Sequence, residues 1–321
     1  MRYPDFPVLI TQPMMPLIQQ GIESRFPSAR LSEQEDRAGF LAREGARFKG
    51  VVTGQGAASD DALFAALPNL RIVSSFGVGY DLVDARAAKA RGIVVTNTPD
   101  VLTDEVADLA MGLLISTVRR LPQADQHVRK GLWLKGNFPL SDTLRGKTMG
   151  ILGLGRIGKA IARRAEAFGL KLVYHGRAQQ ADVHYPFYAS LVEMAKASDI
   201  LMIIAPGGPS TRRIVDRAVI EALGPEGTLI NVARGTLVDE PVMVEMLQSG
   251  ALGAAGLDVF EDEPKVPEAL FALENVVLLP HVGSASVHTR NRMGQLVVDN
   301  VIALAEGRPP LTPVPETPWS A

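Results

Sequence analysis

Three glycines in the run from Gly153 to Gly158 have the spacing Gly-x-Gly-x-x-Gly. An apolar stretch typical of a strand precedes them, and a helical pattern follows and ends at Gly169. At such a junction the first glycine permits a tight turn, the second lets the backbone approach a pyrophosphate, and the third lets the helix pack against the strand. The helix N-terminus directs N–H groups and partial positive charge at phosphates. Because a purely structural turn seldom has this context on both sides, the run predicts a dinucleotide site made by Gly153, Gly155 and Gly158.

The residues at the tip of the next expected strand indicate which dinucleotide. An NAD site usually has an acidic residue about 20 residues after the glycines, but this tip reads His175-Gly176-Arg177. A glycine leaves room for a 2′-phosphate, and an arginine offers it a charge-assisted partner. We therefore predict NADP(H) as the preferred cofactor, with His175 as a second contact. The alternatives are a solvated Arg177 and a relaxed preference that also accepts NAD(H).

Composition sets the class of protein. A chain of 321 residues is long enough for two domains, and its net charge of −2 gives no electrostatic case for nucleic acid or an anionic membrane. There is no cysteine, which excludes disulfides, thiolate catalysis and cysteine-ligated metal, and we assign no metal site. The first residues lack the apolar core of a signal peptide, and no apolar stretch approaches the length of a membrane span. We expect a cytoplasmic protein.

Short apolar runs rich in β-branched residues alternate with helical patterns throughout the chain, which is typical of an α/β fold with parallel sheets. Six strands are expected after residue 147, the number in a complete doubly wound dinucleotide domain. They are Thr148–Leu152, Lys171–Tyr174, Ile200–Ala205, Leu229–Ala233, Gly256–Val259 and Val276–Leu279. Four more are expected near Val8–Thr11, Lys49–Thr53, Arg71–Ser75 and Ile93–Thr96.

A long helix is predicted from about Thr103 to Arg120, with acidic residues in its first turn and Pro122 ending it. A helix of this length can carry the chain from one domain into the next. We predict a dinucleotide-binding domain over residues 99–286 and a discontinuous substrate domain made of residues 1–98 and 287–321. A ligand is expected in the cleft between them.

Three polar residues follow late strands of the dinucleotide domain, at the sheet edge where ligands bind. They are Arg234, Glu263 and His281. Each also has a structural interpretation: a surface charge, part of a solvated acidic loop, and a histidine bonded to the backbone. Beside a nicotinamide the three together suit ketone reduction. Histidine can donate a proton near neutral pH, a carboxylate stabilises its charged form, and arginine holds a substrate carboxylate.

At these residues the chain closely resembles the D-isomer-specific 2-hydroxyacid dehydrogenases, most of all their glyoxylate/hydroxypyruvate reductase branch. The resemblance covers nearly the whole chain. It rests on the glycine run and on five further motifs: Phe76–Asp81, Val101–Asp108, Asn231–Glu240, Gly256–Pro264 and Pro280–Gly283. The resemblance implies two doubly wound, Rossmann- or flavodoxin-like domains with parallel sheets and an active-site cleft between them.

By the same resemblance, Arg234, Glu263 and His281 match the family's catalytic residues, and Arg234 and His281 also contact substrate. Backbone amides of Val78 and Gly79 are implied to bind the substrate carboxylate. Arg156 and Ile157 would lie against the pyrophosphate, Ala205 and Pro206 would line the adenosine side, and Asp258 would bond the nicotinamide carboxamide. Val232, Ala233 and Gly283 would lie near the nicotinamide.

The activity predicted by this match is reduction of glyoxylate, hydroxypyruvate or a related small 2-oxo acid to the D-2-hydroxy acid. One alternative is an NAD-dependent enzyme for D-lactate or a bulkier 2-oxo acid. Another is a dinucleotide-sensing binding protein like the C-terminal-binding-protein corepressors. The family is usually a homodimer joined through its dinucleotide domains, here through residues 101–140. Trp133 and Phe138 are then either dimer contacts or buried within their own subunit.

Overall fold

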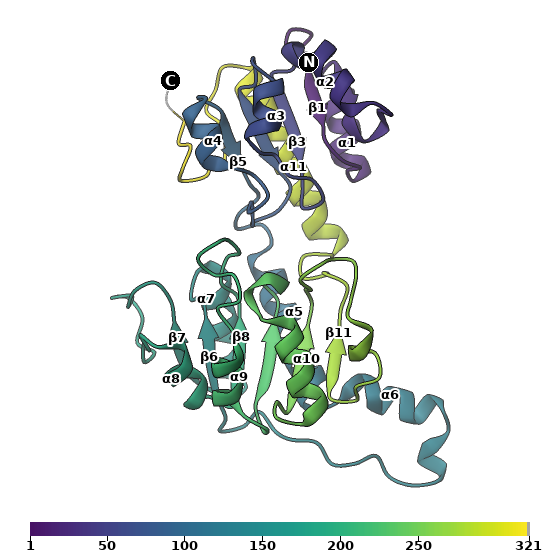
Figure 1. The fold of residues 1–321 in the computed structure, drawn as a ribbon, viewed down its shortest axis with the longest axis vertical. Coiled ribbons are helices and arrows are strands. Elements are labelled where there is room, and N and C mark those ends of the chain that lie inside the picture. The colour runs from purple at the N-terminus through teal and green to yellow at the C-terminus, as the bar shows by residue number, and fades with distance from the viewer. Residues whose placement is uncertain (320–321) are drawn as a thin grey trace. The chain divides into compact units, whose positions relative to one another are not determined.

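A computed structural model describes residues 1–319 of the chain. The chain forms two compact units (Figure 1). One contains Met1–Leu102 and the segment that begins at Ser286, and the other is Thr103–Ala285. The boundaries expected from the sequence, 98/99 and 286/287, lie close to these. Residues 320 and 321, the last two of the expected substrate domain, lie outside the described residues.

The first unit has a five-stranded, wholly parallel sheet with the order β2-β1-β3-β4-β5. Its strands are β1 (Val8–Ile10), β2 (Ser28–Arg30), β3 (Gly50–Thr53), β4 (Ile72–Ser75) and β5 (Val94–Thr96). Its helices are α1 (Pro16–Glu23), α2 (Arg37–Glu44), α3 (Asp61–Ala66), α4 (Ala85–Ala90) and α11 (Val287–Ala305). Two separate apolar cores fill the space between sheet and helices, one under α1 and α11 and one under α3 and α4. The sheet is therefore covered on both faces.

The second unit has a six-stranded parallel sheet with the order β11-β10-β9-β8-β6-β7. Its strands are β6 (Thr148–Leu152), β7 (Lys171–His175), β8 (Ile200–Ile203), β9 (Thr228–Asn231), β10 (Ala254–Leu257) and β11 (Val276–Leu278). Its helices are α5 (Thr103–Val118), α6 (Leu121–Arg129), α7 (Arg156–Ala167), α8 (Leu191–Lys196), α9 (Arg217–Leu223) and α10 (Glu240–Ser249). One core lies between the sheet and α5 with α7, and another between the sheet and α8, α9 and α10.

These two sheets confirm the predicted fold class of two doubly wound parallel α/β domains. In the second unit the chain runs from β6 outward to β7 and then crosses to β8 on the other side of β6. This reversal is a topological switch point, where the carboxyl ends of parallel strands leave a crevice for ligands. All six strands predicted after residue 147 are present. Four of them end one or two residues before the predicted ends, because the last residues of those runs already turn into loops, whereas β7 continues one residue further, to His175.

The predicted role of Pro122 is wrong. Helix α5 ends at Val118, two residues before the predicted end, and a second helix, α6, begins at Leu121 with Pro122 in its first turn. Arg120 between them has a φ of 51°, a left-handed conformation that ends α5 before proline is reached. Proline is tolerated in a first turn because its missing N–H would have no helical acceptor there. Figure 1 shows α6 projecting away from the sheet of its unit.

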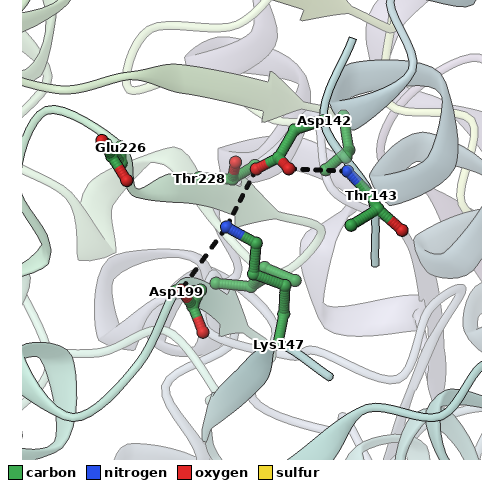
Figure 2. A pocket seen from close by; sticks show the side chains of 8 residues that line it. Asp142, Thr143, Lys147, Asp199, Glu226 and Thr228 are labelled. Atoms are coloured by element: carbon green, nitrogen blue, oxygen red, sulfur yellow. Dashed lines mark hydrogen bonds and ion pairs between the residues drawn. The ribbon is translucent and has the colours of Figure 1, made fainter. Parts of the chain in front are cut away.

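At the amino end of the second sheet, a small cluster of charges fastens the segment after α6 to the strands. Lys147 Nζ lies 2.9 Å from Asp142 Oδ2 and 3.6 Å from Asp199 Oδ1. Figure 2 shows Lys147 between these two carboxylates. The ammonium group holds the pKa of Asp142 below its usual value, and the two carboxylates raise the pKa of Lys147 despite its burial. Because one ammonium group pairs with both carboxylates, the cluster holds the segment before β6 against the start of β8.

Within residues 1–319, no helix combines the length and apolar character needed to span a bilayer. Even α11, with 19 residues, carries His288, Arg290 and Arg292 near its start.

Candidate active site

The glycine run forms the turn between β6 and α7 in the way its spacing predicts. Gly153 has a φ of 100°, and a Cβ at this position would lie 2.6 Å from the backbone of Ala205, two residues after the end of β8. A Cβ at Gly158 would lie 2.3 Å from the Gly153 carbonyl oxygen. Both contacts require glycine, because no side chain fits between backbones this close. The structure thus brings the glycine turn against Ala205 at the switch point.

Gly155 differs from the other two glycines. It precedes the first residue of α7, its φ of −83° suits any residue, and a Cβ there would meet nothing within 4 Å. Among the described residues, no side chain caps the first turn of α7, which Arg156 and Ile157 begin. An open approach to the N-terminus of a twelve-residue helix suits a phosphate group, because that end offers N–H donors and partial positive charge. The residues present therefore fit a dinucleotide pyrophosphate.

The predicted 2′-phosphate residues lie directly after β7. His175 Nδ1 lies 2.9 Å from the carbonyl oxygen of Tyr188, and since a carbonyl only accepts, Nδ1 carries the proton and Nε2 is left for another partner. Gly176 has open space around it, and Arg177 is exposed. Within residues 1–319, Arg177 has no hydrogen-bond or ion-pair partner. The tip of β7 therefore offers an arginine that can pair with a phosphate, and it has no acidic residue that would repel one.

The three predicted catalytic residues lie together at the carboxyl edge of the second sheet. Arg234 follows β9, Glu263 follows β10 and His281 follows β11, three strands that are neighbours in the sheet. His281 Nδ1 lies 2.7 Å from Glu263 Oε2, and both side chains are about one-third exposed, at 27% and 35%. The charge of Arg234 also acts on Glu263. The interpretation of Glu263 as part of a purely solvated acidic loop is therefore wrong.

Burial of Glu263 favours its neutral form, but the hydrogen bond and charge of His281 outweigh burial. The pKa of Glu263 consequently lies below its usual value, and the carboxylate is ionised at neutral pH. An ionised Glu263 accepts the Nδ1–H of His281 and holds the ring in one orientation. The Nε2 atom is then the position from which the ring can give a proton.

Asp258 fixes the backbone that carries the histidine. Its side chain is 1% exposed, and its two oxygens accept the N–H groups of Val282 and Gly283, each at 2.8 Å. Its carbonyl oxygen accepts the N–H of His281, whose φ of 53° places it in the left-handed region. Burial raises the pKa of Asp258, although these amides and the charge of His281 oppose the shift. The structure gives Asp258 a part in shaping this turn, and its predicted contact with the carboxamide stays a prediction.

Asn231, part of the motif Asn231–Glu240, braces the turn that carries Arg234, a role that the sequence did not predict. Its Nδ2 donates to the Arg234 carbonyl oxygen at 2.9 Å, and its Oδ1 accepts the Ala233 N–H at 3.1 Å. Asn231 is 1% exposed, while Val232 and Ala233 beside it are also buried. The signal for its role was present, because a buried amide at the end of an apolar strand needs partners and here finds them in the turn before Arg234.

The predicted substrate-binding amides belong to the first unit. The loop Phe76–Gly79 follows β4, where Thr98 Oγ1 accepts the Gly77 N–H at 3.1 Å and Asn97 Nδ2 donates to the Val78 carbonyl at 2.9 Å. Within the described part of the chain, the N–H groups of Val78 and Gly79 have no acceptor. Both therefore remain able to donate to a ligand.

Comparisons with known proteins identify the family of the chain. The D-isomer specific 2-hydroxyacid dehydrogenase NAD-binding domain matches residues 111–283. Hydroxyphenylpyruvate reductase of Plectranthus scutellarioides is 50% identical, with 96% of this chain and 98% of the relative covered. Glyoxylate/hydroxypyruvate reductase A of Arabidopsis thaliana is 49% identical over the same shares.

Among solved structures, the NADPH-dependent glyoxylate/hydroxypyruvate reductase of Sinorhizobium meliloti, in complex with NADP and malonate, is 48% identical with a TM-score of 0.92. The similarity covers 99% of both chains. Fold, site and similarity together define an oxidoreductase with a dinucleotide-binding domain. The chain belongs to the D-isomer specific 2-hydroxyacid dehydrogenase family.

The open space at Gly155 gives a test of the dinucleotide site. In Gly155→Ala the new methyl group meets no protein atom, so the melting temperature should stay unchanged while NADP(H) affinity falls at least about tenfold, or about 1.4 kcal/mol. Cofactor titration by fluorescence measures the affinity. Gly112→Ala, at an equally open position in α5, is the control. Equal cofactor affinity in Gly155→Ala and the wild type would contradict a pyrophosphate at this turn.

Proposed function

We propose that the protein is an NADP(H)-preferring reductase that converts glyoxylate, hydroxypyruvate or a related small 2-oxo acid to the D-2-hydroxy acid. The observation that carries the proposal is the 2.7 Å contact between His281 and an ionised Glu263 at the sheet edge that Arg234 shares. The reductases of Arabidopsis thaliana and Sinorhizobium meliloti, at 49% and 48% identity, support the substrate class.

In the proposed reaction, protonated His281 gives a proton to the substrate's keto oxygen. Because Nδ1–H is committed to Glu263, the proton comes from Nε2, and the carboxylate stabilises the imidazolium before transfer. A reduced nicotinamide, when bound, would supply the hydride that the keto carbon accepts. Arg234 would hold the substrate carboxylate through its planar guanidinium, and the N–H groups of Val78 and Gly79 would add two further donors.

The cofactor would be held by residues of the second unit. The glycine turn and the first residues of α7 would take the pyrophosphate, Ala205 and Pro206 the adenosine side, and Val232, Ala233, Asp258 and Gly283 the nicotinamide end. The preference for NADP(H) rests on the tip of β7, where Arg177 has no partner among residues 1–319 and Gly176 leaves space. NADP in the related Sinorhizobium meliloti structure supports this preference.

The proposed oligomer is a homodimer formed through residues 101–140. This segment exposes several large apolar side chains, which are costly to leave in water and mark contact surfaces. They are Leu121, Val128, Leu132, Trp133, Leu134 and Leu140. Phe138 instead packs in its own chain, where its ring centroid lies 5.5 Å from that of His127 and 5.2 Å from the Arg120 guanidinium carbon. Trp133, 65% exposed, is the better candidate for a dimer contact.

We also propose a cytoplasmic location, because a chain without cysteine has no need of an oxidising compartment. Cell fractionation would test it, since recovery of the protein outside the cytoplasmic fraction would contradict the proposal.

Replacing the proton donor should remove turnover and leave the cofactor bound. In His281→Ala, kcat for glyoxylate reduction should fall by roughly 10²–10⁴, while the Kd for NADPH stays within about twofold of the wild type. Steady-state kinetics and fluorescence titration give the two values. His184→Ala, at a histidine whose side chain is 79% exposed, is the matched control and should change neither. Wild-type turnover in His281→Ala would overturn the assignment.

The cofactor preference should depend on Arg177. With NADPH and NADH compared over a panel of glyoxylate, hydroxypyruvate, hydroxyphenylpyruvate and pyruvate, Arg177→Ala should lower kcat/KM for NADPH roughly tenfold and leave NADH nearly unchanged. Arg145→Ala, at another exposed arginine of the same unit, is the control. Better use of NADH than NADPH by the wild type would contradict the preference. Negligible turnover of every substrate would favour a nucleotide sensor instead.

The dimer proposal predicts that a charge on the exposed apolar segment separates the subunits. Leu134 is 94% exposed, so Leu134→Asp should fold normally and convert a dimer into a monomer in analytical ultracentrifugation. Phe271→Asp, at another exposed apolar residue of this unit, should leave the dimer intact. A monomeric wild type at micromolar concentration would rule the dimer out.

A further inference from the structure

An ion-pair cluster joins three segments of the second unit, one of which is the loop that carries Glu263. Glu261 is 19% exposed and its Oε1 lies 2.7 Å from Arg212 Nη2. Arg213 Nη2 lies 3.4 Å from both Glu261 oxygens, and Arg213 Nη1 lies 3.8 Å from Asp239 Oδ2. We call Arg212, Arg213, Asp239 and Glu261 the loop clamp. Its members come from the loop after β8, the start of α10 and the loop after β10.

The clamp is built on the backbone as well as on side chains. Arg213 has a φ of 50°, and its N–H donates to the Thr236 carbonyl oxygen at 2.8 Å. The N–H of Val215 donates to Leu237 at 2.9 Å, and that of Asp239 donates back to Val215 at 3.0 Å. The loop after β8 is thereby joined to the segment that follows Arg234.

The same segment also lies directly against the loop that bears Glu263. A Cβ on Gly235, the neighbour of Arg234, would lie 1.9 Å from the carbonyl carbon of Phe260. The N–H of Glu261 donates to Glu240 Oε2 at 3.1 Å, at the first residue of α10. The position of the loop after β10 is thus set by contacts on both sides of Glu261.

Glu263 depends on this loop for its own placement. Its Oε1 accepts the N–H of Phe260 at 3.2 Å, and its Oε2 contacts His281 Nδ1 at 2.7 Å. Movement of residues 260–261 would therefore move the carboxylate that orients the histidine. The turns that carry His281 and Arg234 are held by the buried side chains of Asp258 and Asn231. The position of the half-buried Glu263 depends instead on the loop after β10.

We propose that Glu261, held by Arg212 and Arg213, is a positioning residue that keeps Glu263 aligned with His281. The proposal rests on the proposed function in one respect, the transfer of a proton from His281. Glu261 need not touch substrate or cofactor. Its effect is to maintain a donor–acceptor geometry in which displacement of a few tenths of an ångström already weakens proton transfer.

The variants Glu261→Ala and Glu261→Gln test the proposal in the full-length protein. Glu261→Ala should lower kcat for glyoxylate roughly tenfold, with NADPH affinity and KM nearly unchanged. The solvent deuterium isotope effect on kcat should rise, because a misaligned pair makes proton transfer slower relative to other steps. Glu261→Gln, which retains a hydrogen-bond acceptor for Arg212, should lose less.

An NMR measurement that does not depend on turnover distinguishes the positioning role of Glu261 from the proposed reductase function. The Nδ1 proton of His281, shared with Glu263, should give a downfield signal in the proton NMR spectrum that His281→Ala removes. Glu261→Ala should shift or broaden this signal. Glu245→Gln is the matched control, because Arg217 and Glu245 form a 2.6 Å pair between α9 and α10.

The control should change neither kcat, the isotope effect nor the signal. An unchanged signal and isotope effect in Glu261→Ala would overturn the positioning role even if His281→Ala abolishes turnover. If Glu261→Ala loses the signal while the wild-type protein reduces no 2-oxo acid, the positioning role of Glu261 is supported and the proposed function is rejected.

Discussion

The adjacency of β9, β10 and β11 in one parallel sheet is the constraint on which the candidate site depends. Their register pairs Leu257 with Asn231 on one side and with Leu278 on the other, so all three strands end at nearly the same level. Residues that follow each strand therefore emerge at one edge. Arg234, Glu263 and His281, far apart in the sequence, meet there because parallel strands share a direction.

Two carboxylates at this edge have different environments and different effects. Asp258 is buried, its pKa is raised, and its oxygens are taken up by two backbone N–H groups. Glu263 is half-buried, its pKa is lowered, and one of its oxygens contacts the imidazole. The first shapes the turn and the second stabilises charge on the ring. Division of these tasks leaves the backbone next to the histidine fixed by one carboxylate and the histidine ring oriented by the other.

The sequence predicted the fold class and most elements because apolar periodicity and glycine spacing are local properties. The sequence did not predict strand β2, because Ser28–Arg30 is three residues long and contains no apolar run. The sequence also did not predict helix α6, because a proline after a helical pattern indicates a helix end, whereas Pro122 lies in the first turn of a new helix. In both places short segments are defined by neighbours: β2 by pairing with β1, and the break before α6 by the left-handed Arg120.

By itself the sequence determined the glycine turn, the missing acid after β7 and the polar residues at three strand ends, because each is a matter of residue type and spacing. Only the tertiary structure decided that Glu263 contacts His281, that Asn231 braces Arg234, and that Glu261 lies between two arginines. These contacts join loops that follow different strands. Their geometry depends on sheet order and on close backbone packing such as Gly235 on Phe260, which no local pattern records.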